Sequence, residues 1–338
     1  MQHQRANRII ILFSLWFCGA LLVLAFAGSV HPAGTTVDFA RCLDELRTTA
    51  LNEGVSAETF IRATEGLTPD MRTVDNMERQ VEFTLTFTEY LARQVTAARI
   101  HTGRAKLAEH DELLAEIEAR YGVDPAIIVA IWGMESSFGA AAGNFPVVQS
   151  LATLSCYGRR QPFFRNEFFS ALRILEQGDV AMDDFRGSWS GAFGQTQFLP
   201  TSFERLAIDY SGDGRRDIIG SVPDALASAA HYLQQARWQR GLPWGFAVNA
   251  PATFSLPVGD WKERQPLSFW QEQGFKRADG SALITAELSA ISQAGLVATG
   301  SGSGPYFLVL ANFDALHRYN PALNYALAIG HLADRIRE

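Results

Sequence analysis

The sequence has few cysteines, no excess of basic residues and no internal repeat, and each shortage argues against a class of protein. Its 338 residues include three cysteines, with no C-x-x-C pair or His/Cys cluster of the kind that binds zinc. The formal net charge of −7 is a poor match to nucleic acid or to anionic membrane surfaces. Without a solenoid-length repeat, the 47% hydrophobic and 19% charged composition indicates a globular protein of one large domain or two unequal lobes.

The N-terminus has the pattern of an export signal. Arg5 and Arg8 precede an uncharged run from Ile9 to Ala27, which ends in the small residues that a signal peptidase requires. A run of this length could also span a bilayer if it stayed uncleaved. Residues 1–27 are therefore predicted to be a signal peptide or an N-terminal membrane anchor, with cleavage after Ala27 preferred. Cys18 follows the bulky Phe17, which argues against lipid attachment.

Two cysteines remain beyond the export segment, Cys42 and Cys156. Export permits a disulfide between them, but two buried thiols explain the sequence equally well.

The rest of the chain is mainly helical. Residues 28–37 read as a linker, and apolar residues recur at helical spacing through the N-terminal region, residues 38–104, and on to about residue 119. Gly54, Pro69 and Gly103 are predicted to separate helices there. Gly122 should end one helix and Asp124 should cap the next. Further helices are expected at 163–177, 222–237 and 321–337.

Residues 246–310 have a different character, with frequent Gly and Pro and short alternating runs at 254–258 and 306–310 that are typical of strands. The predicted fold class is mainly α (α+β), with this small β-containing lobe inserted into a helical protein. Residues 311–338 are predicted to be a C-terminal helix that completes the helical core.

Glu135 is the first candidate catalytic residue. It ends the apolar helix that begins at Pro125. Burial and the negative end of the helix dipole both favour a protonated carboxyl, so the pKa of Glu135 is expected to rise. A general acid of a glycosidase needs this property. The alternative is a helix-terminal Glu that faces water.

A second candidate segment runs from Gly187 to Pro200. Its three glycines in eight residues allow close backbone approach, and Gln195 and Gln197 place amides beside aromatic surface. This combination suits sugar hydroxyls and N-acetyl groups, although a tight turn with solvated glutamines would look the same.

Together these segments resemble the lytic murein transglycosylases, in the family typified by the membrane-bound lytic transglycosylase B (glycoside hydrolase family 103). The likeness extends from about Phe39 to the C-terminus. Five landmarks occur in order: Tyr121-Gly122-Val123 leading into Glu135-Ser136, Arg159-Arg160, Gly191 to Phe198, Asp209 to Asp217, and Arg318-Tyr319-Asn320 to Tyr325-Ala326.

The resemblance implies a lysozyme-like catalytic core over residues 105–245, with Glu135 as the single general acid and base. The implied reaction cleaves the bond between N-acetylmuramic acid and N-acetylglucosamine in peptidoglycan and forms a 1,6-anhydro ring without adding water. One carboxylate is sufficient for this outcome, since the acetamido group and the 6-hydroxyl of the sugar take the roles of the second carboxylate and of water.

The resemblance also implies residues that contact substrate. Ser188 and Gln197 should orient acetamido groups, and the arginines should meet peptide or lactyl carboxylates. The complete set of expected binding residues is Ser188, Gln197, Phe198, Leu199, Arg159, Arg160, Tyr232, Tyr319, Asn320, Tyr325 and Tyr90. The tyrosines at 232 and 325 could equally be plain core residues. Phe193, Leu199 and Thr201 depart from the family pattern, which affects the shape of the subsites.

Residues 209–224 begin like an EF-hand calcium loop, but Gly220 stands where the twelfth-position Glu is required. The resemblance suggests that Asp224 closes a longer loop around a weak structural calcium or sodium ion. An Asp/Gly turn without metal is the alternative. The expected ligands are Asp209, Ser211, Asp213, Arg215, Asp217 and Asp224.

The predicted protein is therefore a periplasmic, monomeric enzyme that needs no cofactor for catalysis and acts on peptidoglycan strands, alone or within cell-wall synthesis or division complexes. A hydrolytic muramidase is the nearest alternative, with Asp183 or Asp184 as its second carboxylate. A catalytically inactive cell-wall binding protein is the alternative from another class.

Overall fold

The structure is a computed structural model of the chain, and it describes residues 35–79, 85–252, 254, 260–286, 288–299 and 305–338. The export segment and the predicted strand at 254–258, apart from residue 254, lie outside the described residues. Residues 36–338 form one compact unit. Within the described part of the chain, no helix is both long and apolar enough to cross a membrane.

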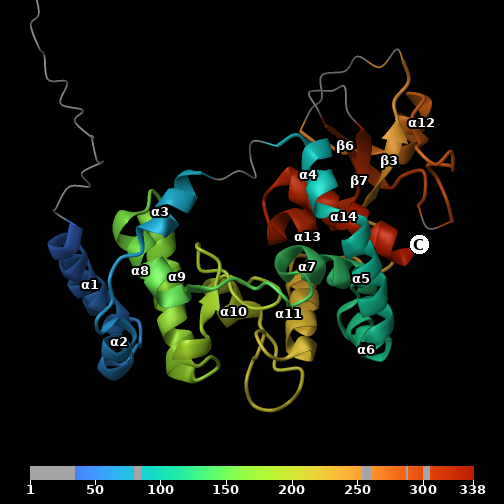
Figure 1. The fold of residues 1–338 in the computed structure, drawn as a ribbon. Helices are drawn as coiled ribbons and strands as arrows, with labels where there is room; N and C mark the ends of the chain where they lie inside the picture. The colour runs from blue at the N-terminus through green and yellow to red at the C-terminus, as the bar shows by residue number, and fades with distance from the viewer. Residues whose placement is uncertain (1–34, 80–84, 253, 255–259, 287, 300–304) are drawn as a thin grey trace, which may run out of the picture. The chain divides into compact units, whose positions relative to one another are not determined.

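The first of three hydrophobic cores is built from six helices, labelled in Figure 1 where space allows. These are α1 (Thr35–Asn52), α2 (Ala57–Thr64), α3 (Met71–Glu78), α8 (Val147–Tyr157), α9 (Gln161–Gln177) and α10 (Pro200–Leu206). A disulfide joins Cys42 to Cys156 and so ties α1 to α8. Of the two readings that the sequence allowed for these cysteines, the disulfide is therefore the one that the fold adopts.

The second core is also helical and surrounds α7 (Pro125–Ser136). It includes α4 (Phe87–Gln94), α5 (Ala97–Glu109), α6 (Asp111–Tyr121), α11 (Val222–Gln235), α13 (Ala311–Tyr319) and α14 (Leu323–Arg337). Helix α7 packs against α14, α5, α11 and α6. As predicted, Gly122 ends α6 and Asp124 caps the next helix. Gly122 has the left-handed conformation, and the Asp124 carboxylate accepts the Ala126 N–H at 2.8 Å.

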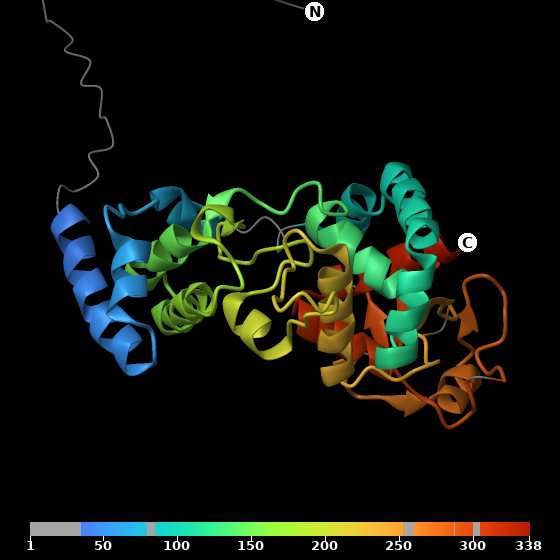
Figure 2. The same ribbon diagram turned by 90° about the horizontal axis from the view of Figure 1, so that it is seen from below.

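The third core belongs to an antiparallel sheet with strand order β4-β6-β7-β3-β5. Its strands are β3 (Gly245–Asn249), β4 (Gln265–Pro266), β5 (Lys276–Arg277), β6 (Gln293–Ala298) and β7 (Tyr306–Val309), with α12 (Leu267–Glu272) between β4 and β5. Along β7, Phe307 and Val309 join the core around α7, whereas Leu308 joins the core of the sheet. In Figures 1 and 2 the sheet lies beside α13 and α14 and away from α8 and α9. The predicted mainly helical fold with a small β-containing lobe is confirmed.

Three short elements complete the described structure: the paired strands β1 (Phe145–Pro146) and β2 (Arg186–Gly187), and the 3-10 turn η2 (Met182–Asp184).

Two details of the predicted helices are wrong. Gly103 does not separate helices but lies within α5. A Cβ atom at this position would lie 2.5 Å from the Ile336 side chain of α14. The glycine is required for close packing of α5 on α14. The C-terminal region is two helices, α13 and α14, and the second begins at Leu323.

Candidate active site

Glu135 lies in the last turn of α7, a helix that is buried on all its faces. Nine of its twelve residues are buried, from Ala126 through Gly133 and at Ser136. A helix surrounded by core in this way holds its end in a fixed place, and the Glu135 side chain emerges there half-buried. The prediction that the apolar helix ends on this carboxylate is confirmed.

The chain turns sharply directly after Glu135. Ser137, Phe138 and Gly139 have successive positive φ angles of 50°, 61° and 86°. Such a conformation is unfavourable for a bulky residue and persists only where packing enforces it. Here the Phe138 ring folds back over Gly133, where a Cβ atom would lie within 2.6 Å of the ring, and packs edge-on against Trp132. Close packing thus fixes the turn that follows the carboxylate.

The second predicted segment meets α7 through Gln195. The Ser136 hydroxyl donates to the Gln195 carbonyl at 2.6 Å, and the Trp132 indole donates to the Gln195 Oε1 at 2.9 Å. Because Gln195 is only 6% exposed and bonded within the protein, it is a structural amide rather than a sugar ligand. Gln197 is half-buried, with φ at 50°, and its amide donates to the carbonyls of Ala142 and Gly194.

A buried tyrosine on α14 contacts Glu135 directly. The Tyr325 hydroxyl donates to Glu135 Oε1 at 2.5 Å. Burial, followed by the Glu135 charge, raises the pKa of Tyr325 well above its ordinary value, so the phenol stays protonated and remains a donor. A donor to the carboxylate favours its ionised form, whereas partial burial favours the neutral form. The expected rise in the pKa of Glu135 therefore stays a prediction.

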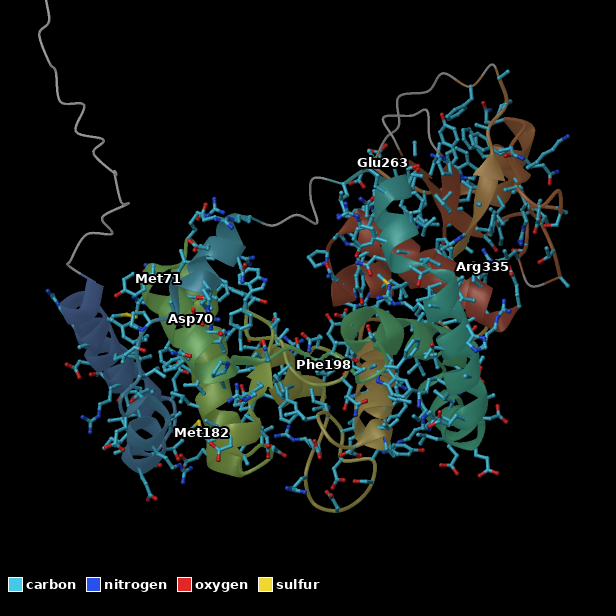
Figure 3. The ribbon with its side chains drawn as sticks, in the orientation of Figure 1. Asp70, Met71, Met182, Phe198, Glu263 and Arg335 are labelled. Carbon is cyan, nitrogen blue, oxygen red and sulfur yellow. A yellow bond between two sulfur atoms is a disulfide. The ribbon has the colours of Figure 1, made fainter. Side chains whose placement is uncertain are left out.

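Three further aromatic residues extend from this pair. Tyr319 and Tyr232 pack with ring centroids 4.6 Å apart, and Phe198 lies 5.8 and 6.0 Å from Tyr232 and Tyr319. The Tyr319 hydroxyl donates to the Thr196 carbonyl at 2.6 Å, and that of Tyr232 donates to the Arg318 carbonyl at 2.7 Å. Both tyrosines pack against both helical cores, so the cluster lies at the seam between the cores. Figure 3 labels Phe198 in this region.

The remaining predicted binding residues near this cluster have varied settings. Tyr90 is buried on α4, close enough for its phenol to affect the pKa of Tyr325. Asn320 is half-buried at the end of α13 and accepts the Ala322 N–H, and Leu199 is the N-cap residue of α10. Ser188 is half-buried, and its hydroxyl accepts the Ala192 N–H at 3.1 Å and bonds to the Ser190 hydroxyl.

The two predicted carboxylate-binding arginines interact with residues outside the cluster. Arg159 is exposed and pairs with Glu78 at 2.9 Å, while the Arg160 guanidinium lies over the Phe163 ring. Neither Glu78 nor Phe163 belongs to the cluster of Tyr232, Tyr319 and Phe198. Both arginines stay predicted contacts for a long substrate.

The acidic loop at 209–224 uses its carboxylates internally. Asp224 is fully buried and accepts the N–H groups of Tyr210, Ser211 and Asp217 at 2.8–3.0 Å. Asp209 accepts two more N–H groups from the loop. In the part of the chain that the structure describes, no group of three or more His, Cys, Asp or Glu side chains could hold a metal ion. The acidic side chains of the predicted ligand set do not converge on one point in this arrangement, and the cation itself stays a prediction.

The two candidates for a second carboxylate are exposed to solvent. Asp183 and Asp184 lie in η2, and Asp183 lines a shallow pocket with Leu67 and Met182. Among the described acids, Glu135 alone raises the pKa of Tyr319 and Tyr325 by its charge. The electrostatics of the cluster therefore centre on one carboxylate.

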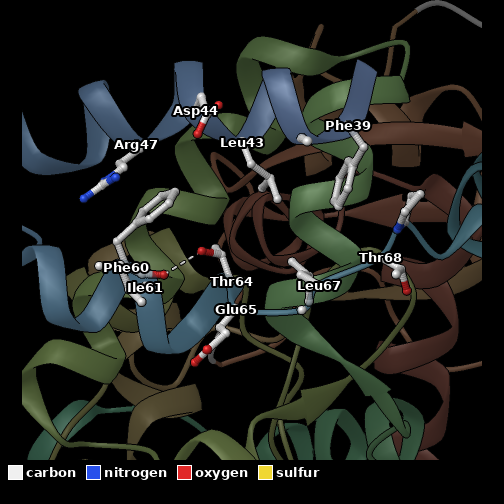
Figure 4. Close-up of a pocket in the computed structure, with 13 residues that line it drawn as sticks. Phe39, Leu43, Asp44, Arg47, Phe60, Ile61, Thr64, Glu65, Leu67 and Thr68 are labelled. Carbon is white, nitrogen blue, oxygen red and sulfur yellow. Dashed lines mark hydrogen bonds between the residues drawn. The ribbon is translucent and has the colours of Figure 1, made fainter. Parts of the chain in front are cut away.

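A cavity of about 420 Å³ lies away from this cluster, between α1 and α2. Figure 4 shows Phe39, Leu43, Phe60 and Leu67 among its lining residues. None of the predicted site residues lines it. Its apolar wall is continuous with the first helical core and carries no candidate catalytic group.

Sequence reasoning missed the residues that support Glu135 from behind. Trp132, Ser136 and Phe138 lie in the same motif as the acid, but their partners are distant in sequence. The sequence offered one signal for them, which is that they stand in or beside the Glu-Ser-Ser-Phe-Gly segment at 135–139. A catalytic acid alone does not require these neighbours, so they could have been expected to have a structural role.

Comparison with known proteins agrees with this geometry. The family model described as Transglycosylase SLT domain matches residues 38–334. The chain is 30% identical over 249 residues to the membrane-bound lytic murein transglycosylase B of Escherichia coli (strain K12). That match covers 73% of this chain and 66% of that protein, just under two thirds of its length.

Solved structures also resemble this chain. SltB3 from Pseudomonas aeruginosa, in complex with NAG-anhNAM-pentapeptide, has a TM-score of 0.84 and 44% identity, over 88% of this chain and 79% of that one. Slt35 from Escherichia coli, in complex with calcium, has a TM-score of 0.75 and 26% identity, over 88% and 92%. The expected lysozyme-like fold of these enzymes is confirmed.

Proposed function

Since this chain belongs to the transglycosylase SLT domain family of lytic murein transglycosylases, we propose that it cleaves the MurNAc-β-1,4-GlcNAc bond of peptidoglycan without water, using Glu135 as its single acid and base. The observation that carries this proposal is the Glu135–Tyr325 pair, close to Tyr319, which packs against both helical cores. A rigid helix presents one carboxylate there, beside aromatic and amide groups suited to sugars.

The proposed reaction has two proton transfers at the same carboxyl. Protonated Glu135 first donates its proton to the glycosidic oxygen as the bond to C1 of the muramic acid residue breaks. The ionised carboxylate then removes the proton from the 6-hydroxyl of that sugar, whose oxygen bonds to C1 and closes the 1,6-anhydro ring. The acetamido oxygen stabilises C1 between these steps, so no second carboxylate is needed.

The substrate contacts are part of the same proposal. Tyr319 and Tyr232 provide aromatic surface, the buried Phe198 packs behind them, and Gln197 and Ser188 provide polar groups for acetamido recognition. Tyr90, Asn320 and Leu199 would complete the walls, and Arg159 and Arg160 would meet the carboxylates of the stem peptide. The peptidoglycan fragments bound to SltB3 from Pseudomonas aeruginosa support a substrate of this class.

The cellular setting belongs to the same proposal. The uncharged run at 9–27 supports export to the periplasm, as a cleaved protein or one anchored in the inner membrane, where peptidoglycan is accessible. We place the catalytic core at 105–245, completed by 311–338, and the small lobe at 246–310. We infer that the 209–224 loop is shaped by its own hydrogen bonds and that calcium, where bound, is not required for catalysis.

The test is the mass of the muropeptides that residues 28–338 release from purified peptidoglycan. Products lighter by one water, without new reducing ends, are expected from the wild type. Glu135→Gln should abolish release and leave glycan binding intact, since only the transferable proton is lost. Reducing muramic ends would instead establish a hydrolase, and binding without any release would establish a cell-wall binding protein.

A further inference from the structure

Gln195 is a buried amide whose polar groups all reach other elements of the fold. Its Oε1 accepts the Trp132 indole N–H, and its carbonyl accepts the Ser136 hydroxyl. On the other side, its backbone N–H donates to the Ile218 carbonyl at 2.8 Å, and its Nε2 donates to the Ile219 carbonyl at 3.1 Å. One residue thus joins the catalytic end of α7 to the end of the acidic loop.

Both ends of this connection are rigid. Ile219 and Gly220 donate their N–H groups to the Asp217 carboxylate, and Asp217 in turn donates its N–H to the buried Asp224. On the α7 side, Ser136 directly follows Glu135, and its hydroxyl also accepts the Gly139 N–H at 2.8 Å. A displacement of Gln195 would therefore shift the residue next to the catalytic acid.

Steric packing confirms that the amide is held tightly. A Cβ atom at Gly139 would lie 2.7 Å from the Gln195 Oε1, and one at Gly194 would lie 2.6 Å from the Ile218 side chain. Both glycines have positive φ, at 86° and 75°. The backbone on each side of Gln195 thus approaches as closely as glycine permits.

We propose that Gln195 is a positioning residue, which fixes the Glu135 end of α7 against the 209–224 loop without touching substrate. This inference rests on the proposed function, in which Glu135 transfers the protons. Its consequence is specific: loss of the amide should misplace the acid while the sugar-binding surface stays formed. Misplacement of a reacting group by about 1 Å can cost roughly 100-fold in rate.

The test compares three variants with the wild type on soluble peptidoglycan oligomers. Gln195→Met keeps the side-chain length and removes the two side-chain hydrogen bonds, to Trp132 and Ile219, while the backbone bonds to Ser136 and Ile218 remain. Trp132→Phe removes only the indole donor to Gln195. Trp270→Phe is the matched control, because its buried indole donates to the Ala294 carbonyl at 3.0 Å within the β-containing lobe. Thermal unfolding shows how much each variant loses in stability.

We expect kcat to fall about 10- to 100-fold in Gln195→Met, with KM within roughly twofold of wild type because the binding surface stays formed. Trp132→Phe should show a smaller fall, and Trp270→Phe should lower the Tm with kcat unchanged. Hydrogen–deuterium exchange over residues 133–141 should increase in the first two variants only. Unchanged kcat and unchanged exchange in Gln195→Met would overturn the positioning role, as would an equal kcat loss in the Trp270 control.

The products of the wild type show whether the proposed function fails, independently of the Gln195 variants. If the wild type makes reducing ends, the anhydro reaction is wrong, and the kcat ratio still tests Gln195, since Glu135 is the acid in both reactions. If the wild type releases nothing, hydrogen–deuterium exchange over 133–141 decides whether Gln195 holds the end of α7.

Discussion

The hydrogen bond from Tyr325 to Glu135 leads to the sharpest prediction about this site. Tyr325→Phe removes one hydroxyl and leaves the ring that fills the core around α14. A hydrogen bond to a charged group contributes about 1.5–3 kcal/mol, which corresponds to roughly 10- to 150-fold in rate if it serves only to hold the carboxyl. We therefore expect the kcat of Tyr325→Phe to be lower than that of the wild type by roughly 10- to 150-fold.

The pH dependence should change in a defined direction. Because the phenol donates to the carboxylate, it favours the ionised form, and its removal favours the protonated form that acts as the acid. The alkaline limb of the kcat profile should therefore move to higher pH in Tyr325→Phe. The phenol does not titrate in the working range, since burial and the Glu135 charge raise the pKa of Tyr325 well above 10.0.

Tyr121→Phe is the matched control for this substitution. Tyr121 is 6% exposed at the end of α6, and its hydroxyl has no hydrogen-bond partner among the described residues. Removing that hydroxyl should leave kcat and the pH profile unchanged and should not reduce stability. The assay is initial-rate release of soluble muropeptides from pH 4 to 9. If Tyr325→Phe retains both the wild-type kcat and the wild-type alkaline limb, the contact does not position the acid.

Three other predictions concern stability. Replacing Cys42 and Cys156 by alanine should lower the free energy of unfolding in urea by roughly 4 to 5 kcal/mol, because the disulfide closes a loop with a sequence separation of 114; a loss under about 1 kcal/mol would contradict this. Burial raises the pKa of Glu167, so the protonated carboxyl stabilises the fold below its ordinary pKa of 4.5, and this contribution is lost as the pH rises. The free energy of unfolding of Glu167→Gln should therefore increase relative to that of the wild type from pH 4 to 7. A difference between the two proteins that stays constant with pH would contradict this. Asp224→Asn should lower the free energy of unfolding by about 1–3 kcal/mol, because it leaves a backbone donor unpaired. EDTA should not change the Tm of the wild type. A lower Tm with EDTA that calcium restores would show that a cation completes the loop.

Local chemistry made several features predictable from the sequence. The cap at Asp124, the helix end at Gly122 and the apolar helix ending at Glu135 depend on neighbouring residues only, and the structure confirms all three. Gly103 was mispredicted because its role depends on Ile336, more than two hundred residues away. A local pattern cannot distinguish a glycine that ends a helix from one that lets another helix approach.

The sequence by itself determined the mainly helical class, the family resemblance and the identity of the candidate acid, since each is carried by contiguous motifs. Only the tertiary structure decided that Tyr325 donates to Glu135, that Gln195 is structural, and that Cys42 pairs with Cys156. In the acidic loop the tertiary structure shows that the buried Asp224 binds backbone N–H groups, and the cation that the pattern predicts stays a prediction. These hydrogen-bond partners come together because segments distant in sequence pack against each other, and the spacing of residues along the chain does not specify that packing.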